Sequence, residues 1–148
     1  MNRKVVVTGV GVLTSIGNNK EDFQRALFAG KSGIARITKF DASSFSSRIG
    51  SEILNFNTDL LSEKEKKKYS LFVQYALYSA HQAIKDSGLC LEKSDPKRIG
   101  VIVGSGIGGI DTLEKEHQNL LSKGPKGVSP YLIPMIIIDM ADGLIPLF

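Results

Sequence analysis

The sequence has 148 residues, of which 42% are hydrophobic and 23% are charged, and its formal net charge is +4. This composition is typical of a globular chain and excludes a collagen-like or disordered one. The single cysteine excludes a disulfide framework and a multi-cysteine zinc site, and the small basic excess falls short of a nucleic-acid-binding signature.

Nothing in the sequence predicts insertion into a membrane. The longest nearly unbroken apolar run, residues 131–138, is far shorter than the roughly 20 residues that span a bilayer. The apolar stretch after Arg3 and Lys4 is interrupted by glycines and hydroxyl residues, and no small-residue cleavage site follows it. We therefore expect a soluble, cytoplasmic chain.

The first part of the chain predicts a strand, a helix and a second short strand. Residues 5–8 read Val-Val-Val-Thr and are closed by glycine, which predicts a buried first strand. Asn18 or Asn19 is placed to cap a helix that ends at Gly30. A short strand is expected around residues 48–54.

The strongest helix signal covers residues 62–87. Ser62 and Glu65 have the spacing of a capping box, and Gly88 stands just past the last turn. Apolar and small side chains recur on two adjacent stripes, which predicts burial against more than one neighbour. A continuous helix here would be about 37 Å long.

A second strand and a glycine turn are predicted further along. Residues 99–103 are almost wholly apolar, as in a strand covered on both faces of a parallel sheet. The glycine-rich turn at residues 104–109 leads into a helix that ends at Gly124. One side of that helix carries Leu113, His117, Leu120 and Leu121. Strand, helix, strand, turn and helix in this order indicate an α/β fold.

The glycine turn allows two interpretations. Gly104, Gly106 and Gly109 match the G-x-G-x-x-G spacing of dinucleotide-binding loops. That interpretation also requires a strand ending in an acidic residue about 20 residues on, and the sequence there has neither. Tight packing of the turn explains the glycines better, and a small dinucleotide-binding α/β domain stays an alternative.

A cluster of basic side chains begins the long helix, at Lys64, Lys66, Lys67 and Lys68. Glu63 and Glu65 dilute its charge, so an ordinary solvated face is one explanation. A non-catalytic module that binds an acidic protein is the other, because such charges raise association rates and fix orientation. Nucleic acid is not expected as a partner, because no aromatic stacking platform accompanies the cluster.

The residues alone predict no catalytic set, cofactor site or metal site. His81 and His117 have no cysteine, aspartate or serine partner at a recognisable spacing. Cys90 follows a helix end and lacks the helix start that usually activates a nucleophilic thiol.

Five blocks of the sequence resemble the β-ketoacyl-[acyl-carrier-protein] synthases, the condensing enzymes of fatty-acid synthesis. The blocks occur in the family's order and spacing, most like the type II elongating synthases, and lie at residues 5–18, 30–33, 72–76, 104–109 and 129–134. The resemblance implies an incomplete thiolase-like α/β fold, with layered helices around a mixed or parallel sheet. Residues 1–148 would be the N-terminal half-domain of an enzyme that is usually a homodimer.

The resemblance also implies a decarboxylative Claisen condensation of an acyl thioester with malonyl-carrier protein. Basic residues that dock the acidic acyl carrier protein match Lys64, Lys67 and Lys68, and acyl-pocket positions match Ile107 and Leu132. The family's catalytic cysteine and two histidines match no residue of this chain and would follow its last residue. We therefore expect this chain alone to be inactive and to hold no cofactor.

Two departures from the family pattern fall near the end of the sequence. Asp139 stands where the family usually has asparagine, and Asp142 where it has a small residue. Burial of either carboxylate without a partner would be costly. Pro146 is expected to break the helix that carries them.

Overall fold

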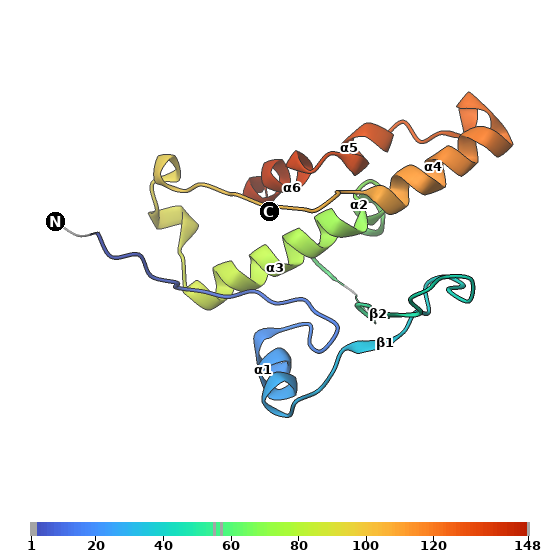
Figure 1. Ribbon diagram of the computed structural model, residues 1–148. Coiled ribbons are helices and arrows are strands. Elements are labelled where there is room, and N and C mark those ends of the chain that lie inside the picture. Colours follow the sequence, from blue (N-terminus) through green and yellow to red (C-terminus); the bar gives the residue numbers. More distant parts are fainter. Residues whose placement is uncertain (1–2, 55, 57, 148) are drawn as a thin grey trace. The chain divides into compact units, whose positions relative to one another are not determined.

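The computed structural model describes residues 3–54, 56 and 58–147. They divide into two compact units, shown with their helices and strands in Figure 1. Unit 1 comprises Met1–Thr58 and Gln82–Gly88, and unit 2 comprises Asp59–His81 and Leu89–Phe148. The two units are described separately below.

Unit 1 contains helix α1 (Lys20–Phe28), which begins and ends where the sequence predicts. Asn19 is the N-cap, and its Oδ1 accepts a hydrogen bond from the Asp22 backbone N–H at 2.8 Å. After the helix, Gly30 has a φ of +64°, a conformation that glycine adopts without steric penalty. The predicted start and stop signals of this helix are confirmed.

A two-stranded antiparallel ribbon follows α1. Strand β1 (Ile34–Arg36) pairs with β2 (Ile49–Ser51), and Ala35 stands opposite Gly50. The strand expected around residues 48–54 is therefore present, but it is shorter than predicted.

The strand predicted at residues 5–8 is wrong. These residues, all of them described, form no strand, and Val5 is 95% exposed. The chain beyond them instead contacts the end of α3 (Leu71–Ser87). The Val10 N–H donates to Asp86 Oδ2 at 2.9 Å.

The helix predicted over residues 62–87 is divided, and its last residues, from Gln82 on, belong to unit 1. Helix α2 (Glu63–Lys66) ends after one turn, and α3 begins at Leu71. The prediction of one continuous helix is therefore wrong, although both of its ends are correct. The hydrophobic core of unit 2 packs against α3. Its buried residues in the described chain are Leu61, Val73, Leu77 and Leu144. Partly buried side chains pack against them, namely Tyr69, Phe72, Met140 and Ile145.

The other regular elements in the described part of unit 2 are helices and helical turns. Helix α4 (Ile110–Lys123) packs with α5 (Leu132–Ile136), and α6 (Asp139–Leu144) leads into a turn of 3-10 helix, Ile145–Leu147 (Figure 1). Other single turns of 3-10 helix occur at Leu91–Lys93, Pro96–Arg98 and Pro125–Gly127. In the described part of the chain, no helix has both the length and the apolar character needed to cross a membrane.

The strand predicted at residues 99–103 is also wrong. This segment lies within the described residues but forms no strand, and Ile102 is 96% exposed.

The N–H of Val103 donates to Asp142 Oδ1 at 2.6 Å, so the half-buried Asp142 has a partner. Asp139 is exposed, and neither carboxylate is buried without compensation. Pro146 lies just past α6, in the 3-10 turn, as its predicted helix-breaking role requires.

Helix α4 has the predicted extent, and the side that carries its leucines is exposed. Its buried residues are Thr112 and Glu116, whereas Leu121 on the predicted apolar side is 75% exposed. Gly124 ends the helix with a φ of +71°, as predicted. Polar contacts to the following loop therefore position α4: Glu116 Oε2 accepts the Ser129 N–H at 2.6 Å.

Candidate functional site

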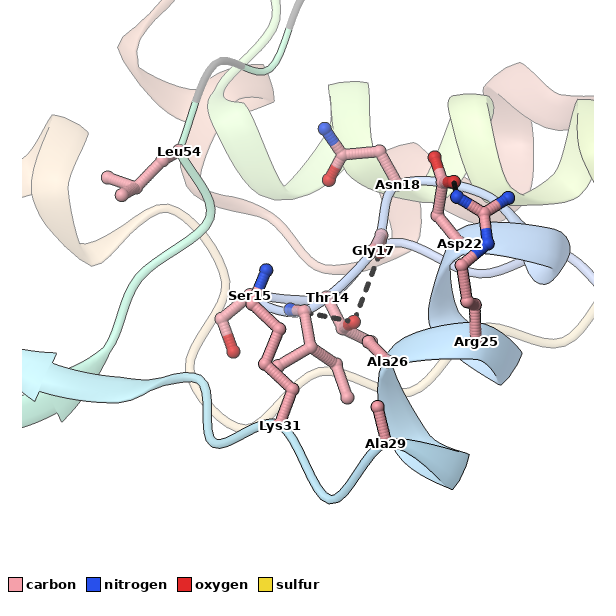
Figure 2. Close-up of a pocket in the computed structure, with 11 residues that line it drawn as sticks. Thr14, Ser15, Gly17, Asn18, Asp22, Arg25, Ala26, Ala29, Lys31 and Leu54 are labelled. Carbon is pink, nitrogen blue, oxygen red and sulfur yellow. Dashed lines mark hydrogen bonds and ion pairs between the residues drawn. The ribbon is translucent and has the colours of Figure 1, made fainter.

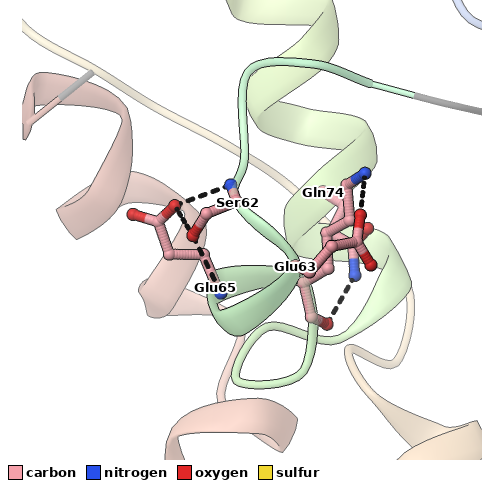
Figure 3. Close-up of polar contacts among 5 residues, drawn as sticks. Ser62, Glu63, Glu65 and Gln74 are labelled. Atoms are coloured by element: carbon pink, nitrogen blue, oxygen red, sulfur yellow. Dashed lines mark hydrogen bonds and ion pairs between the residues drawn. The ribbon is translucent and has the colours of Figure 1, made fainter.

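The basic segment, residues 63–68, begins on a complete capping box (Figure 3). The Glu65 N–H donates to Ser62 Oγ at 3.3 Å, and the Ser62 N–H donates to Glu65 Oε2 at 2.8 Å. The hydrogen bonds from the Ser62 hydroxyl and N–H hold the pKa of Glu65 below its ordinary value. Glu65 is thus ionised at neutral pH, and the start of α2 is fixed by reciprocal bonds.

The end of the basic segment is held by Gln74 of α3. The Gln74 Nε2 group donates to the Lys66 carbonyl at 3.1 Å (Figure 3) and to the Tyr69 carbonyl at 2.8 Å. Gln74 is 8% exposed, so these two bonds satisfy carbonyls in a sheltered position. They divide α2 from α3 and orient the turn that carries the last lysines of the segment.

The lysines of the segment occupy different environments. Lys66 Nζ lies 2.8 Å from Glu63 Oε1, and the lysine side chain is only 23% exposed. That contact is the leading cause of a lowered pKa at Glu63. Lys64 and Lys67 are exposed. The positive charge of Lys66 is therefore paired with a carboxylate of the same helix, whereas the charges of Lys64 and Lys67 face solvent.

Lys68 differs from both of these exposed lysines. Its side chain is half-buried, and its Nζ lies 5.5 Å from the ring centroid of Tyr131, within the range of a cation–π interaction. The residues predicted to dock a carrier protein therefore comprise two exposed cations, Lys64 and Lys67, and one cation held against an aromatic ring.

The two predicted acyl-pocket residues lie on successive elements of unit 2. Ile107 is 65% exposed in the glycine turn before α4. Leu132 is half-buried as the first residue of α5, which packs with α4. Ile107 thus presents an apolar side chain that the described part of the chain leaves largely uncovered.

Only the last two glycines of the turn are closely packed: a Cβ on Gly104 or Gly106 would meet no atom of the described residues within 4 Å, so the predicted tight packing is confirmed at Gly109 alone among the three motif glycines. A Cβ on Gly108 would lie 2.5 Å from the Ile136 carbonyl oxygen, and one on Gly109 would meet the Met135 carbonyl. The N–H groups of these glycines point to protein acceptors, Gly108 to Ser105 Oγ at 3.0 Å and Gly109 to Ile136 O at 3.5 Å. Because these donors are engaged, the turn does not favour the phosphate-binding alternative.

Unit 1 holds a cavity of about 510 Å³ beside α1 (Figure 2). Its lining includes Thr14, Ser15 and Lys31, together with Arg25, whose Nη1 lies 3.4 Å from Asp22 Oδ1. No histidine or cysteine is among the lining residues. The cavity therefore offers hydrogen-bonding groups and charge, without the nucleophile that a condensing site requires.

The cysteine and the histidines lie on separate elements. Cys90 is exposed beside a single 3-10 turn, and His81 and His117 are exposed on α3 and α4. Across the described residues, no group of three or more histidine, cysteine or acidic side chains could hold a metal ion. None of these three residues has an arrangement that favours catalysis.

Gln74 and Tyr131 were missed by sequence reasoning. Gln74 falls inside an apparently continuous helical pattern, where an amide side chain indicates nothing special. Tyr131 contacts Lys68 from a distant part of the sequence, and periodicity carries no signal of such a contact. The available hints were that Gln74 and Tyr131 each lie in a block that resembles the family, residues 72–76 and 129–134.

Comparison with known sequences gives two kinds of match. The domain described as "Beta-ketoacyl synthase, N-terminal domain" matches residues 2–148. A 3-oxoacyl-[acyl-carrier-protein] synthase 2 of Coxiella burnetii is 46% identical over 144 residues, which cover 97% of this chain and 35% of the relative. The synthase 2 of Vibrio harveyi is 44% identical over 142 residues, covering 95% and 34%. The chain thus spans about a third of the length of these relatives.

Solved structures show the same relationship. The ishigamide ketosynthase/chain length factor matches with a TM-score of 0.79 and 26% identity, over 96% of this chain and 36% of its own. A type II polyketide ketosynthase in complex with its acyl-carrier protein matches with a TM-score of 0.71 and 25% identity, over 96% and 37%. These matches confirm the predicted partial, thiolase-like α/β fold.

Proposed function

The chain belongs to the β-ketoacyl synthase N-terminal domain family, and we propose that residues 1–148 form the N-terminal half-domain of a 3-oxoacyl-[acyl-carrier-protein] synthase. In the proposed reaction an acyl group passes from its carrier to an enzyme thiol. A carbon–carbon bond then forms between the acyl carbonyl and malonyl-carrier protein, carbon dioxide leaves and the thiol is released. The relatives of the same name, at 46% and 44% identity, support this assignment.

The role we assign to this chain is docking of the acyl carrier protein. The observation that supports this docking role is the difference between the lysines of the basic segment: Lys66 is paired with Glu63, whereas Lys64 and Lys67 are exposed. Exposed cations steer an acidic partner and fix its orientation. The structural relative seen in complex with its acyl-carrier protein supports a partner of this class.

Ile107 and Leu132 are assigned to the acyl pocket. The large exposure of Ile107 supports this role, because a largely uncovered apolar side chain is available to contact an acyl chain. We assign no catalytic role to Cys90, His81 or His117 and no cofactor to the chain. The proposal includes a homodimeric, cytoplasmic enzyme, as the family resemblance implies.

Charge reversal tests the docking role. The double variant Lys64→Glu, Lys67→Glu should bind purified acyl carrier protein about tenfold more weakly than the unmodified chain at low salt, because two attractive charges become repulsive. Its affinity should also depend less on salt concentration. Fluorescence anisotropy with labelled carrier protein, at two salt concentrations, measures both quantities.

Two control variants accompany this measurement. Lys66→Met removes a charge that is already paired within α2, so it should change the affinity far less. The double variant Lys64→Arg, Lys67→Arg keeps both charges and should bind like the unmodified chain. Equal affinity of the charge-reversed and unmodified chains would contradict the docking role.

A further inference from the structure

The geometry points to Tyr131 as a positioning residue for carrier-protein docking, acting through Lys68; this inference rests on the docking role proposed above. Lys68 Nζ lies 5.5 Å from the centroid of the Tyr131 ring. Lys68 is half-buried, in contrast to the exposed Lys64 and Lys67. The ring is thus the feature that distinguishes this lysine from its neighbours.

The Tyr131 ring is mounted on a fixed backbone. Its N–H donates to Ser129 Oγ at 3.2 Å, and its carbonyl accepts the Met135 N–H at 3.0 Å, inside the first turn of α5. Ser129 is fixed in turn, because its own N–H donates to the buried Glu116 of α4 at 2.6 Å. The backbone that carries the ring is therefore positioned by α4 and α5, through bonds that do not involve the basic segment.

A ring at a fixed position limits the conformations of the Lys68 side chain. A free lysine loses rotamer entropy when a partner immobilises it, and that loss weakens binding. Contact with Tyr131 restricts the side chain before the partner arrives. The ammonium group has three N–H donors, and contact with the ring face uses none of them in a conventional hydrogen bond. This contact therefore leaves all three available to a carboxylate. Because Tyr131 is 44% exposed, the pair lies at the surface, where a carboxylate can reach it.

The placement of Tyr131 also connects two predicted roles. The next residue is Leu132, the predicted acyl-pocket position that begins α5. A carboxylate bound at Lys68 would therefore pair with a lysine whose aromatic neighbour directly precedes the pocket residue in the chain. Tyr131 is a positioning residue in this scheme and contacts no reacting atom.

The test compares Tyr131→Leu with Tyr131→Phe in the full chain. Leucine removes the aromatic face, whereas phenylalanine keeps it and removes only the hydroxyl. Tyr131→Leu should weaken binding of purified acyl carrier protein by about two- to five-fold, the size of an exposed cation–π contact, and Tyr131→Phe should bind like the unmodified chain. In a Lys68→Met background, Tyr131→Leu should have no further effect.

A spectroscopic measurement separates positioning from general loss of structure. Ring current from Tyr131 should shift the Lys68 ε-methylene protons upfield in the NMR spectrum, in the unmodified chain and in Tyr131→Phe but not in Tyr131→Leu. If Lys64→Glu, Lys67→Glu weakens binding and Tyr131→Leu does not, the inference is wrong and the docking role stands. If neither change weakens binding, the docking role itself fails. Equal loss of affinity in the Phe and Leu variants would also overturn the inference.

Discussion

Asp86 joins the first segment of the chain to two other parts of unit 1. Its carboxylate accepts the Val10 N–H at 2.9 Å and is ion-paired with the Lys20 ammonium of α1. The Lys20 contact first, and then the Val10 N–H, hold the pKa of Asp86 below its ordinary value. One side chain near the end of α3 therefore links Val10 and α1.

The stability of the chain should depend on the ionisation of Asp86. Because the folded pKa is lowered, its stabilisation is complete above the unfolded value of about 3.9 and is lost as pH falls through the folded pKa. Asp86→Asn should therefore have a lower urea midpoint than the unmodified chain at about pH 6, and the difference should shrink toward about pH 2. A difference between the two urea midpoints that stays constant over this range would contradict the assignment. Glu21→Gln, an exposed acidic position on α1, is the matched control.

At the scale of elements, two serines precede successive helices and differ in their hydrogen bonding. Ser62 completes the capping box of α2. Ser70 precedes α3 and is 3% exposed, and within the described residues its Oγ is buried without a hydrogen-bond partner. It also lines a small cavity of about 190 Å³. A buried hydroxyl without a partner destabilises the fold, whereas a capping hydroxyl stabilises it.

The same substitution at these two serines should therefore have opposite effects. Ser62→Ala should lower the free energy of unfolding by about 1 kcal/mol, the usual value of an N-cap. Ser70→Ala should raise it by about 1 kcal/mol, because it removes an unsatisfied group. Urea titration of both variants measures the difference. A loss of stability in Ser70→Ala comparable to that in Ser62→Ala would show that the Ser70 hydroxyl has a partner.

Local signals of helices could be read from the sequence, and contacts between distant residues could not. The caps at Asn19 and Ser62 and the stop at Gly124 were predictable because a cap depends on only a few successive residues. The break between α2 and α3 was not, because the Gln74 amide bonds to the Lys66 and Tyr69 carbonyls inside a pattern that remains helical. The docking lysines were predictable from the family resemblance, whereas the contact of one of them with Tyr131 required coordinates.

The incorrect strand predictions have one physical cause. Val, Ile and Thr favour extended backbone, but a strand forms only when another strand accepts its hydrogen bonds. Residues 5–8 and 99–103 pair with no strand in the described chain: Val103 donates instead to Asp142, and Val10, just past the first segment, donates to Asp86. The sequence thus favours extended backbone at residues 5–8 and 99–103. Neither segment forms a strand, because the described part of the chain offers no neighbouring strand to pair with it.

At the scale of the whole molecule, apolar surface is distributed unevenly. Val5 and Ile102 are 95% and 96% exposed, each within an extended, β-branched segment that pairs with no strand of the described chain. Leu121 is 75% exposed as well, but its backbone is engaged inside helix α4. Exposed extended segments can pair with another chain through their free backbone groups, and a helical leucine cannot.

This difference predicts how the chain associates with itself. The unmodified chain should form concentration-dependent oligomers at micromolar to millimolar concentrations, with a gain of β-sheet signal in circular dichroism. Ile102→Lys should reduce this association strongly, because a charge on an unpaired extended segment opposes edge-to-edge pairing. Leu121→Lys introduces the same charge on a helix and should reduce it much less. Sedimentation velocity over a concentration series compares the three chains. If the two lysine variants dissociated equally, the association would come from general apolar contact, and a strictly monomeric unmodified chain would exclude pairing altogether.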